Sequence, residues 1–135
     1  MPIEDDSKIQ NILRTSKTVA LVGASENPNR DSHRIMRFLL DQEYDVHPVN
    51  PQYENVLGRK CVPDLASVPA SIDIVDVFRN ADAVPGIVDE AIAVKAKVLW
   101  LQFGVIHEEA ARKAENHGLQ VIMDHCIAVD HRRLI

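Results

Sequence analysis

Residues 19–40 combine side chains that bind phosphate with a backbone that phosphate can approach. The stretch VALVGASENPNRDSHRIMRFLL places Gly23 directly after an apolar run, followed by Ser25, Arg30 and Ser32. A glycine permits a sharp turn, hydroxyls donate to phosphate oxygens, and a guanidinium can bind two such oxygens at once. Because a helical apolar stripe follows, we also expect helix N-terminal amides here. The stretch predicts a phosphate-binding loop, with a simple tight turn and a solvated arginine as the alternatives.

The residues after the next apolar run restrict which phosphate compound fits. Dinucleotide enzymes use three glycines in the first loop and place an acidic residue after the second strand to bind the ribose 2′-hydroxyl. Here the loop has one glycine, and Val49 is followed by Asn50, Pro51 and Gln52. Neither a carboxylate nor an arginine for a 2′-phosphate stands there. These residues argue against a nicotinamide cofactor.

Strands and helices alternate along the chain and must position these residues. Apolar runs predict strands over residues 17–22, 44–49, 73–78, 97–102 and 119–123. Helical periodicity predicts helices over residues 7–14, from 32 onward, 82–94, 107–117 and 128–135. Residues 51–71 read as an irregular connection with one short helical turn. Alternation of this kind predicts an α/β fold, a three-layer, doubly wound, Rossmann-like parallel sheet of five strands in the order 3-2-1-4-5.

Ligands of such sheets bind at the carboxyl ends of the strands. Besides the two segments above, these ends carry Phe78-Arg79, Gln102-Phe103-Gly104 and Asp124-His125-Cys126. Trp100 lies within an apolar run, so we expect it in the core. No pair of carboxylates is spaced for acid–base work, since Asp73 and Asp76 fall on opposite faces of their strand.

The overall composition indicates one domain over residues 1–135, with residues 1–6 flexible. The 135 residues are 46% apolar and 26% charged, and the net charge of −5 argues against nucleic-acid binding. No apolar run has membrane-spanning length, and the acidic N-terminus lacks the features of a signal peptide. We therefore expect a cytoplasmic protein without a membrane partner.

The two cysteines predict neither a disulfide nor a metal site. Cys61 and Cys126 lie far apart and form no CxxC pattern. Cys126 stands beside His125, but a metal needs three or four ligands and a nucleophilic thiol needs a base held within reach. We expect Cys126 to be a buried structural cysteine, and we assign no catalytic and no metal-binding residue.

Five segments in the same order along the chain resemble a known family. They read VGASENPNRDS, VHPVNP, DIVDVFR, VLWLQFGV and MDHCIAVDHRRL. Together they resemble the small single-domain CoA-binding proteins of bacteria and archaea, which are similar to free-standing N-terminal domains of the succinyl-CoA synthetase α subunit. The resemblance covers residues 7–135 and implies coenzyme A (CoA) or an acyl-CoA as the ligand. It leaves a protein partner or a homo-oligomer open.

The resemblance also implies a position for each part of the ligand. The diphosphate would lie on the loop Gly23, Ala24 and Ser25, with Arg30 and Ser32 nearby. The adenine and ribose would lie against Asn50 and Pro51. The pantetheine arm would pass Phe78 and Arg79 toward Gln102, Phe103 and Gly104.

The segment after the second strand departs from the synthetase. The synthetase has a lysine just beyond the proline, where this chain has Gln52 and Tyr53. Arg59 and Lys60 are then the candidates for a contact with the 3′-phosphate.

The function expected from these observations is binding of CoA or an acyl-CoA, with no catalysis of the protein's own evident. One alternative is an NAD(P)-dependent oxidoreductase with a degenerate glycine fingerprint, for which only His125 and Asp124 offer a proton. Another is a regulatory or partner module that has lost ligand binding. If Cys126 lies near the thiol of bound CoA, a mixed disulfide is a further possibility.

Overall fold

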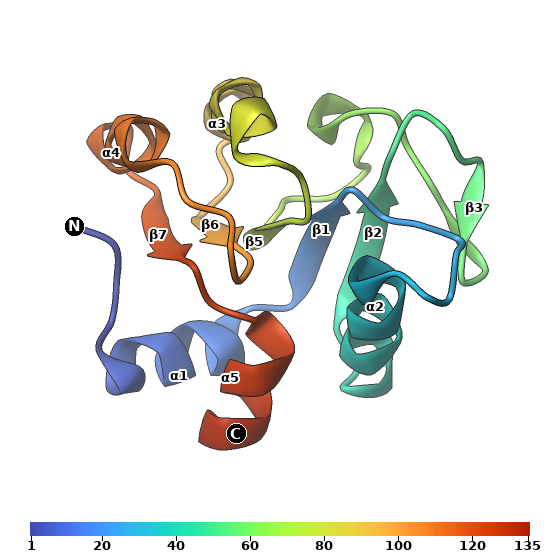
Figure 1. Ribbon diagram of the computed structural model, residues 1–135, viewed down its shortest axis with the longest axis horizontal. Coiled ribbons are helices and arrows are strands. Elements are labelled where there is room, and N and C mark those ends of the chain that lie inside the picture. The colour runs from blue at the N-terminus through green and yellow to red at the C-terminus, as the bar shows by residue number, and fades with distance from the viewer.

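A central sheet of five parallel strands carries helices on both faces in the computed structural model, which describes residues 1–135 (Figure 1). The strands of this sheet are β1 (Thr18–Val22), β2 (Asp45–Val49), β5 (Ile74–Val77), β6 (Val98–Leu101) and β7 (Gln120–Met123). The α-helices are α1 (Asp6–Thr15), α2 (Asp31–Asp41), α3 (Val84–Ala93), α4 (Glu108–Asn116) and α5 (Ile127–Leu134). Each predicted strand and helix is present, with ends that differ by a few residues. The predicted class, a doubly wound parallel sheet, is confirmed.

The order of the strands is β2-β1-β5-β6-β7. Counted from one to five in chain order, this is 2-1-3-4-5, so the third strand, β5, pairs directly with β1. The order written from the sequence, 3-2-1-4-5, has that strand outside β2 instead. The apolar pattern of a buried strand shows that both its faces are covered, but it carries no information about which strand lies beside it.

The helices divide between the two faces of the sheet in a way that opens a crevice. Helices α3 and α4 cover one face, and α1, α2 and α5 cover the other (Figure 1). Because α2 leaves β1 toward one face and α3 leaves β5 toward the other, the chain diverges at the carboxyl ends of these two neighbouring strands. This is the topological switch point, where ligands of doubly wound sheets bind.

A small hairpin interrupts the long connection between β2 and β5. Its strands are β3 (Asn55–Val56) and β4 (Arg59–Lys60), and the sequence pattern had predicted only the short turn that follows, Leu65–Ser67. The backbone N–H of Leu57 in the hairpin turn donates to Glu26 Oε1 across 3.0 Å. The hairpin is therefore joined to the loop that follows β1.

The interior of the sheet contains one carboxyl group without a partner. Asp76 on β5 is fully buried and lies in register between Leu21 and Trp100. Both of its carboxylate oxygens lack a hydrogen-bond partner, and burial raises the pKa of Asp76 well above its ordinary value. Trp100 is itself fully buried, as predicted. No helix of the structure is both long and apolar enough to cross a membrane.

Candidate functional site

The loop after β1 touches the loop after β5, and only a glycine fits at their contact. Gly23 has a φ of +90°, and a Cβ atom added there would lie 2.4 Å from the carbonyl oxygen of Phe78. The backbone N–H of Gly23 donates to Val49 O across 2.9 Å, which continues the pairing with β2. Gly23 therefore allows the carboxyl ends of β1, β2 and β5 to converge.

Asn50, at the end of β2, holds this loop in place. Its Nδ2 atom donates to Ala24 O across 2.8 Å, and its Oδ1 atom accepts from the N–H of Gln52 across 2.9 Å. Both ends of the side-chain amide are thus used within the protein. Asn50 positions the loop through these two hydrogen bonds, and one Nδ2 hydrogen and one Oδ1 lone pair remain.

His33 supports the same loop from α2. It is buried although it stands in the first turn of that helix. Arg37 approaches Nε2 of His33 across 3.3 Å, and a guanidinium can only donate, so the proton of the neutral ring is on Nδ1. Nδ1 then donates to Ser25 O across 2.8 Å. The hydroxyl of Ser25 accepts from the N–H of Asn27 across 3.0 Å.

Several backbone N–H groups in this region have no acceptor within the protein. Four of them belong to Ala24 and Ser25, which are buried, and to Asp31 and Ser32, the first two residues of α2. Arg30 occupies the N-cap position of α2, and its side chain makes no capping hydrogen bond. Buried amides are almost always satisfied, so the amides of Ala24 and Ser25, beside the open N-terminus of α2, indicate a place for an acceptor from outside the chain.

A polar cleft of about 570 Å³, the loop cleft, contains these amides. It is lined by Gly23, Ala24, Ser25, Asn27, Asn29, Arg30, Asp31, Ser32, Asn50, Gln52, Tyr53, Phe78, Arg79 and Asn80. Arg30 and Arg79 form no ion pair, while the carboxylate of Asp31 is paired with Arg34. The free charge on the walls of the loop cleft is therefore positive.

A second, larger cleft adjoins the first. This α2/α5 cleft, of about 870 Å³, shares Asp31, Phe78, Arg79 and Asn80 with the loop cleft. It continues over the ends of β6 and β7 to α5, and about half of its lining residues are apolar. The two clefts form one path along the carboxyl ends of the strands.

Gln102 lies in the floor of the α2/α5 cleft with one donor unused. It is 5% exposed, and its Oε1 atom accepts from the N–H of Ile127 across 3.1 Å. Its Nε2 atom has no partner within the protein. Nearby, Asp124 Oδ1 accepts from the N–H of Gly104 across 2.7 Å, which joins the ends of β6 and β7.

His125 is held between carboxylates at the wall of this cleft. Nδ1 of His125 lies 2.7 Å from Asp130, and Nε2 lies 3.0 Å from Glu4. Burial lowers the pKa of His125, but the two carboxylates outweigh burial and the pKa is raised overall. Trp100 fixes the backbone here, because its Nε1 donates to His125 O across 2.9 Å. His125 is thus engaged in structure rather than presented to the cleft as a free base.

Cys126 lies at the N-cap of α5 and lines the α2/α5 cleft. It is half-buried, so the expectation of a buried cysteine is not met there. Cys61 is the buried one, and its thiol donates to Asn50 O across 3.4 Å. No group of three or more histidine, cysteine, aspartate or glutamate side chains is arranged to hold a metal ion.

The structure brings most of the residues singled out in the sequence to these two clefts. Those that line the loop cleft are Gly23, Ala24, Ser25, Arg30, Ser32, Asn50, Phe78 and Arg79. Gln102 and Phe103 line the α2/α5 cleft. Pro51 and Gly104 line neither, although both adjoin residues that do.

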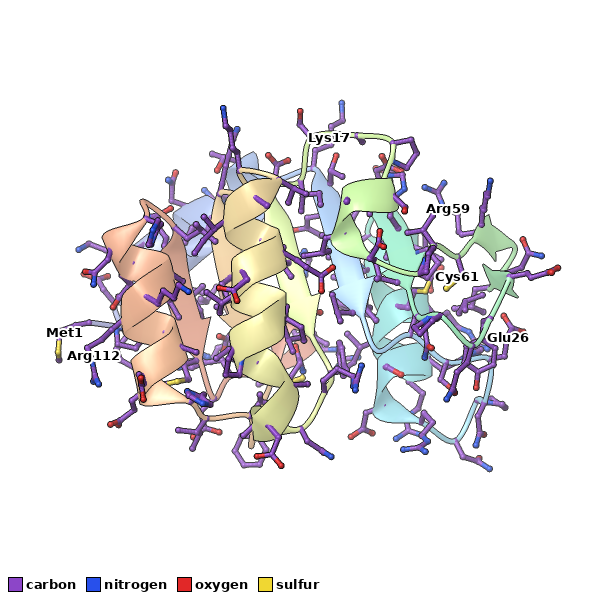
Figure 2. All side chains as sticks on the ribbon, turned by 90° about the horizontal axis from the view of Figure 1, so that it is seen from above. Met1, Lys17, Glu26, Arg59, Cys61 and Arg112 are labelled. Atoms are coloured by element: carbon purple, nitrogen blue, oxygen red, sulfur yellow. The ribbon has the colours of Figure 1, made fainter.

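Arg59 and Lys60 do not reach either cleft. Arg59 forms an ion pair with Asp45 at 2.5 Å and donates to Val46 O across 3.0 Å, and Lys60 is exposed on β4. In Figure 2, Arg59 is labelled on the hairpin side of the molecule, close to Cys61. Neither is placed to replace the lysine of the synthetase.

Several residues of the loop cleft were not anticipated. Asn27, Asn29, Tyr53 and Asn80 line it. A cluster of asparagines beside the single glycine is the signal that could have found two of them. Tyr53, whose hydroxyl lies 3.4 Å from Ser25 Oγ, comes from a connection with no regular pattern.

A doubly wound sheet with an amide-rich, positively charged cleft at its switch point is typical of α/β domains that bind phosphorylated ligands. The family described as CoA binding domain matches residues 17–132. The chain belongs to this family.

Known proteins share this fold and sequence over different fractions of their length. An uncharacterised protein of Bacillus subtilis, YneT, is 41% identical over 93% of both chains. The solved structure of a hypothetical protein from Pyrococcus horikoshii superimposes with a TM-score of 0.95 at 43% identity, covering 99% of this chain and 96% of that one. The ADP-forming acetate–CoA ligase I of Archaeoglobus fulgidus is 27% identical over 84% of this chain, which corresponds to 18% of the ligase.

Proposed function

We propose that this protein binds CoA or an acyl-CoA along the two adjoining clefts and performs no chemistry of its own. The observation that carries the proposal is the set of four unpartnered amides, at Ala24, Ser25, Asp31 and Ser32, in a cleft with two unpaired arginines. Amides at a loop and a helix N-terminus are donors suited to a diphosphate. The family to which the chain belongs points to CoA as the compound that carries it.

The charged end of the ligand would occupy the loop cleft. Its diphosphate accepts hydrogen bonds from the free amides, and Arg30 and Arg79 neutralise it. Because Arg59 is paired with Asp45, the 3′-phosphate must also draw on these two arginines or remain in solvent. Asn50 contributes indirectly by holding Ala24 in position.

The pantetheine arm would continue into the α2/α5 cleft. Phe78 and Arg79 line both clefts, so an extended chain passes them on its way across the sheet. The arm contains two amides, and the free Nε2 of Gln102 is a donor for one of their carbonyl oxygens. A carbonyl oxygen of the bound arm would give this donor a partner.

The polar groups beyond Gln102 support binding rather than catalysis. His125 is engaged with Glu4 and Asp130, and Asp124 accepts from a backbone amide. An oxidoreductase would need one of these two groups to exchange a proton with its substrate. It would also need a carboxylate after β2 to bind the ribose 2′-hydroxyl, and the chain has Asn50 there, which holds the loop after β1.

Isothermal titration calorimetry tests the proposal directly. We expect saturable binding of CoA, with weaker binding of ADP and no preference for NAD⁺ or NADP⁺. Arg112→Ala is a control variant that should keep the affinity for CoA, because Arg112 is on α4, which covers the face of the sheet opposite to α2 and α5 (Figure 2). No heat of binding at millimolar CoA, or tighter binding of NAD⁺ than of CoA, would overturn the proposal.

A further inference from the structure

The α2/α5 cleft extends beyond the expected path of the pantetheine arm. Gln102 and Phe103 lie at the end of β6, whereas the far part of the cleft is formed by α2 and α5. Its walls there include Ile35 and Phe38 from α2 and Ala128 and Val129 from α5. This part is apolar, and half of Val129 is exposed to solvent.

One cation without a carboxylate partner stands at this apolar end. The guanidinium carbon of Arg132 lies 4.6 Å from the centre of the Phe38 ring, and Arg132 forms no ion pair. The packing against an aromatic ring holds the guanidinium over the cleft wall.

The other charged side chains that line this cleft, apart from Arg79, already have partners. Arg34 pairs with Asp31, and Asp130 contacts both His125 and Arg133. Asp124 accepts from the N–H of Gly104 at the opposite end, where β6 and β7 finish. Arg79 lies at the junction with the loop cleft. Arg132 is therefore the charge that an additional group in the far part of the cleft would meet.

We propose that the far part of the α2/α5 cleft holds the acyl group of a CoA thioester, and that Arg132 selects an acyl group ending in a carboxylate. This inference rests on the proposed function, because it needs the CoA part of the ligand to be bound first. The methylene groups of such an acyl chain would lie on Phe38 and Val129. The terminal carboxylate would then lie in reach of the planar guanidinium, which binds carboxylates through two parallel hydrogen bonds.

Pairs of thioesters with equal chain length test the charge preference. We would titrate the protein with succinyl-CoA against butyryl-CoA, and with glutaryl-CoA against valeryl-CoA. We expect the carboxylate-bearing member of at least one pair to bind about three- to tenfold more tightly, as for an ion pair that is partly exposed. Equal affinities within both pairs would overturn the assignment of an anionic acyl group.

Substitution of Arg132 tests which residue is responsible. Arg132→Met keeps the length and apolar stem of the side chain, and it should abolish the preference while leaving the affinity for free CoA unchanged. Arg112→Met on the opposite face of the sheet is the matched control and should keep the preference. Arg132→Gln serves if the methionine variant unfolds, and the thermal midpoint of each variant reports on folding.

The outcomes separate this inference from the proposed function. A preference that persists in Arg132→Met, or a loss of free CoA affinity equal to the loss of thioester affinity, would overturn the role of Arg132. Thioesters that all bind more weakly than free CoA would overturn the acyl site while leaving CoA binding intact. If neither CoA nor any thioester binds, the proposed function itself fails.

Discussion

Asn50 and Ala24 lie just beyond the ends of the neighbouring strands β2 and β1, and the Asn50 side chain joins them: its Nδ2 donates to Ala24 O across 2.8 Å. The other end of the same amide accepts from the N–H of Gln52. The position of the loop after β1 is therefore set by a residue that follows β2. This arrangement uses, for loop positioning, the place at which dinucleotide enzymes present a ribose-binding carboxylate.

Asn50→Ala should lower the unfolding free energy of the protein and its affinity for CoA. Loss of two hydrogen bonds, one to the carbonyl of a buried residue, should cost about 1–3 kcal/mol of unfolding free energy. Denaturant unfolding measures that cost, and calorimetry with CoA measures the accompanying loss of affinity. Gln52→Ala is the control, because Gln52 contributes its backbone N–H and keeps it. Unchanged CoA affinity in Asn50→Ala would contradict the positioning role.

Arg30→Ala should weaken CoA binding about ten- to a hundredfold, since a charge-assisted hydrogen bond contributes about 1.5–3 kcal/mol. Arg30 is exposed and forms no ion pair, so unfolding free energy should barely change. Arg30→Lys should recover part of the loss, because an ammonium group lacks the planar fork. Calorimetry should show the same loss of affinity in Arg30→Ala for CoA and for dephospho-CoA, because dephospho-CoA keeps the diphosphate. A penalty confined to CoA would assign Arg30 to the 3′-phosphate instead.

Gly23→Ala should destabilise the protein by about 2–4 kcal/mol, because the new Cβ combines a positive φ with a backbone clash. The clash is with Phe78 O, at 2.4 Å. Gly104→Ala is the matched control: Gly104 has a φ of +85°, but a Cβ there meets nothing within 4 Å. We expect a cost of about 1 kcal/mol for that variant. Equal thermal shifts for the two variants would show that the contact with Phe78 does not matter.

Asp76→Asn should stabilise the protein at neutral pH by about 1–3 kcal/mol, because the buried, unpartnered carboxyl must take up a proton or bury a charge on folding and an amide need do neither. Burial raises the pKa of Asp76 in the folded state above its ordinary value of 3.8. Below that value the group is protonated in both states and costs little. Its cost grows as the pH rises from 3.8 toward the folded pKa and is constant above it. The advantage of the variant should therefore shrink on acidification toward pH 4.

Asp73, which directly precedes β5, has a pKa shifted in the opposite direction to that of Asp76. It accepts from the N–H groups of Lys17 and Thr18. Burial raises the pKa of Asp73, but these hydrogen bonds and Lys97 outweigh it, so the pKa is lowered overall. Asp73→Asn should then destabilise the protein at neutral pH, and the difference should fade as the pH drops below 3.8. Chemical denaturation at several pH values measures the unfolding free energy of both variants relative to the parent protein. This difference should rise with pH for Asp76→Asn and fall with pH for Asp73→Asn, and a change in the same direction for both would refute the two pKa directions.

The strand pattern and the residues at the strand ends could be predicted because they follow from local rules. Buried parallel strands read as continuous apolar runs, and their carboxyl ends must lie at one edge of the sheet. Gly23, Arg30 and Arg79 were placed at this edge on those grounds, and the structure has them in one cleft. Their roles toward a ligand stay predictions.

The remaining features depend on which strands are neighbours and on how side chains meet across the fold. The pairing of β5 with β1 determines that Gly23 contacts Phe78, and no local pattern specifies it. The engagement of Arg59 by Asp45 likewise requires the hairpin of β3 and β4 to be in place. Asp76 gave no signal in the sequence, since an aspartate in a strand is usually read as facing solvent.

The backbone N–H groups without an acceptor at the start of α2 would couple the folding of this helix to ligand binding by the protein. The amides of Asp31 and Ser32 have no acceptor in the chain, and Arg30 supplies no cap. A bound phosphate would act as the missing cap, so opening of the first turn would also release the ligand. At a ligand concentration one hundred times Kd, such coupling adds about 2.7 kcal/mol to the free energy of that opening. Amide hydrogen exchange in α2 should therefore slow with added CoA, while α4 on the opposite face keeps its rate except where exchange proceeds by global unfolding.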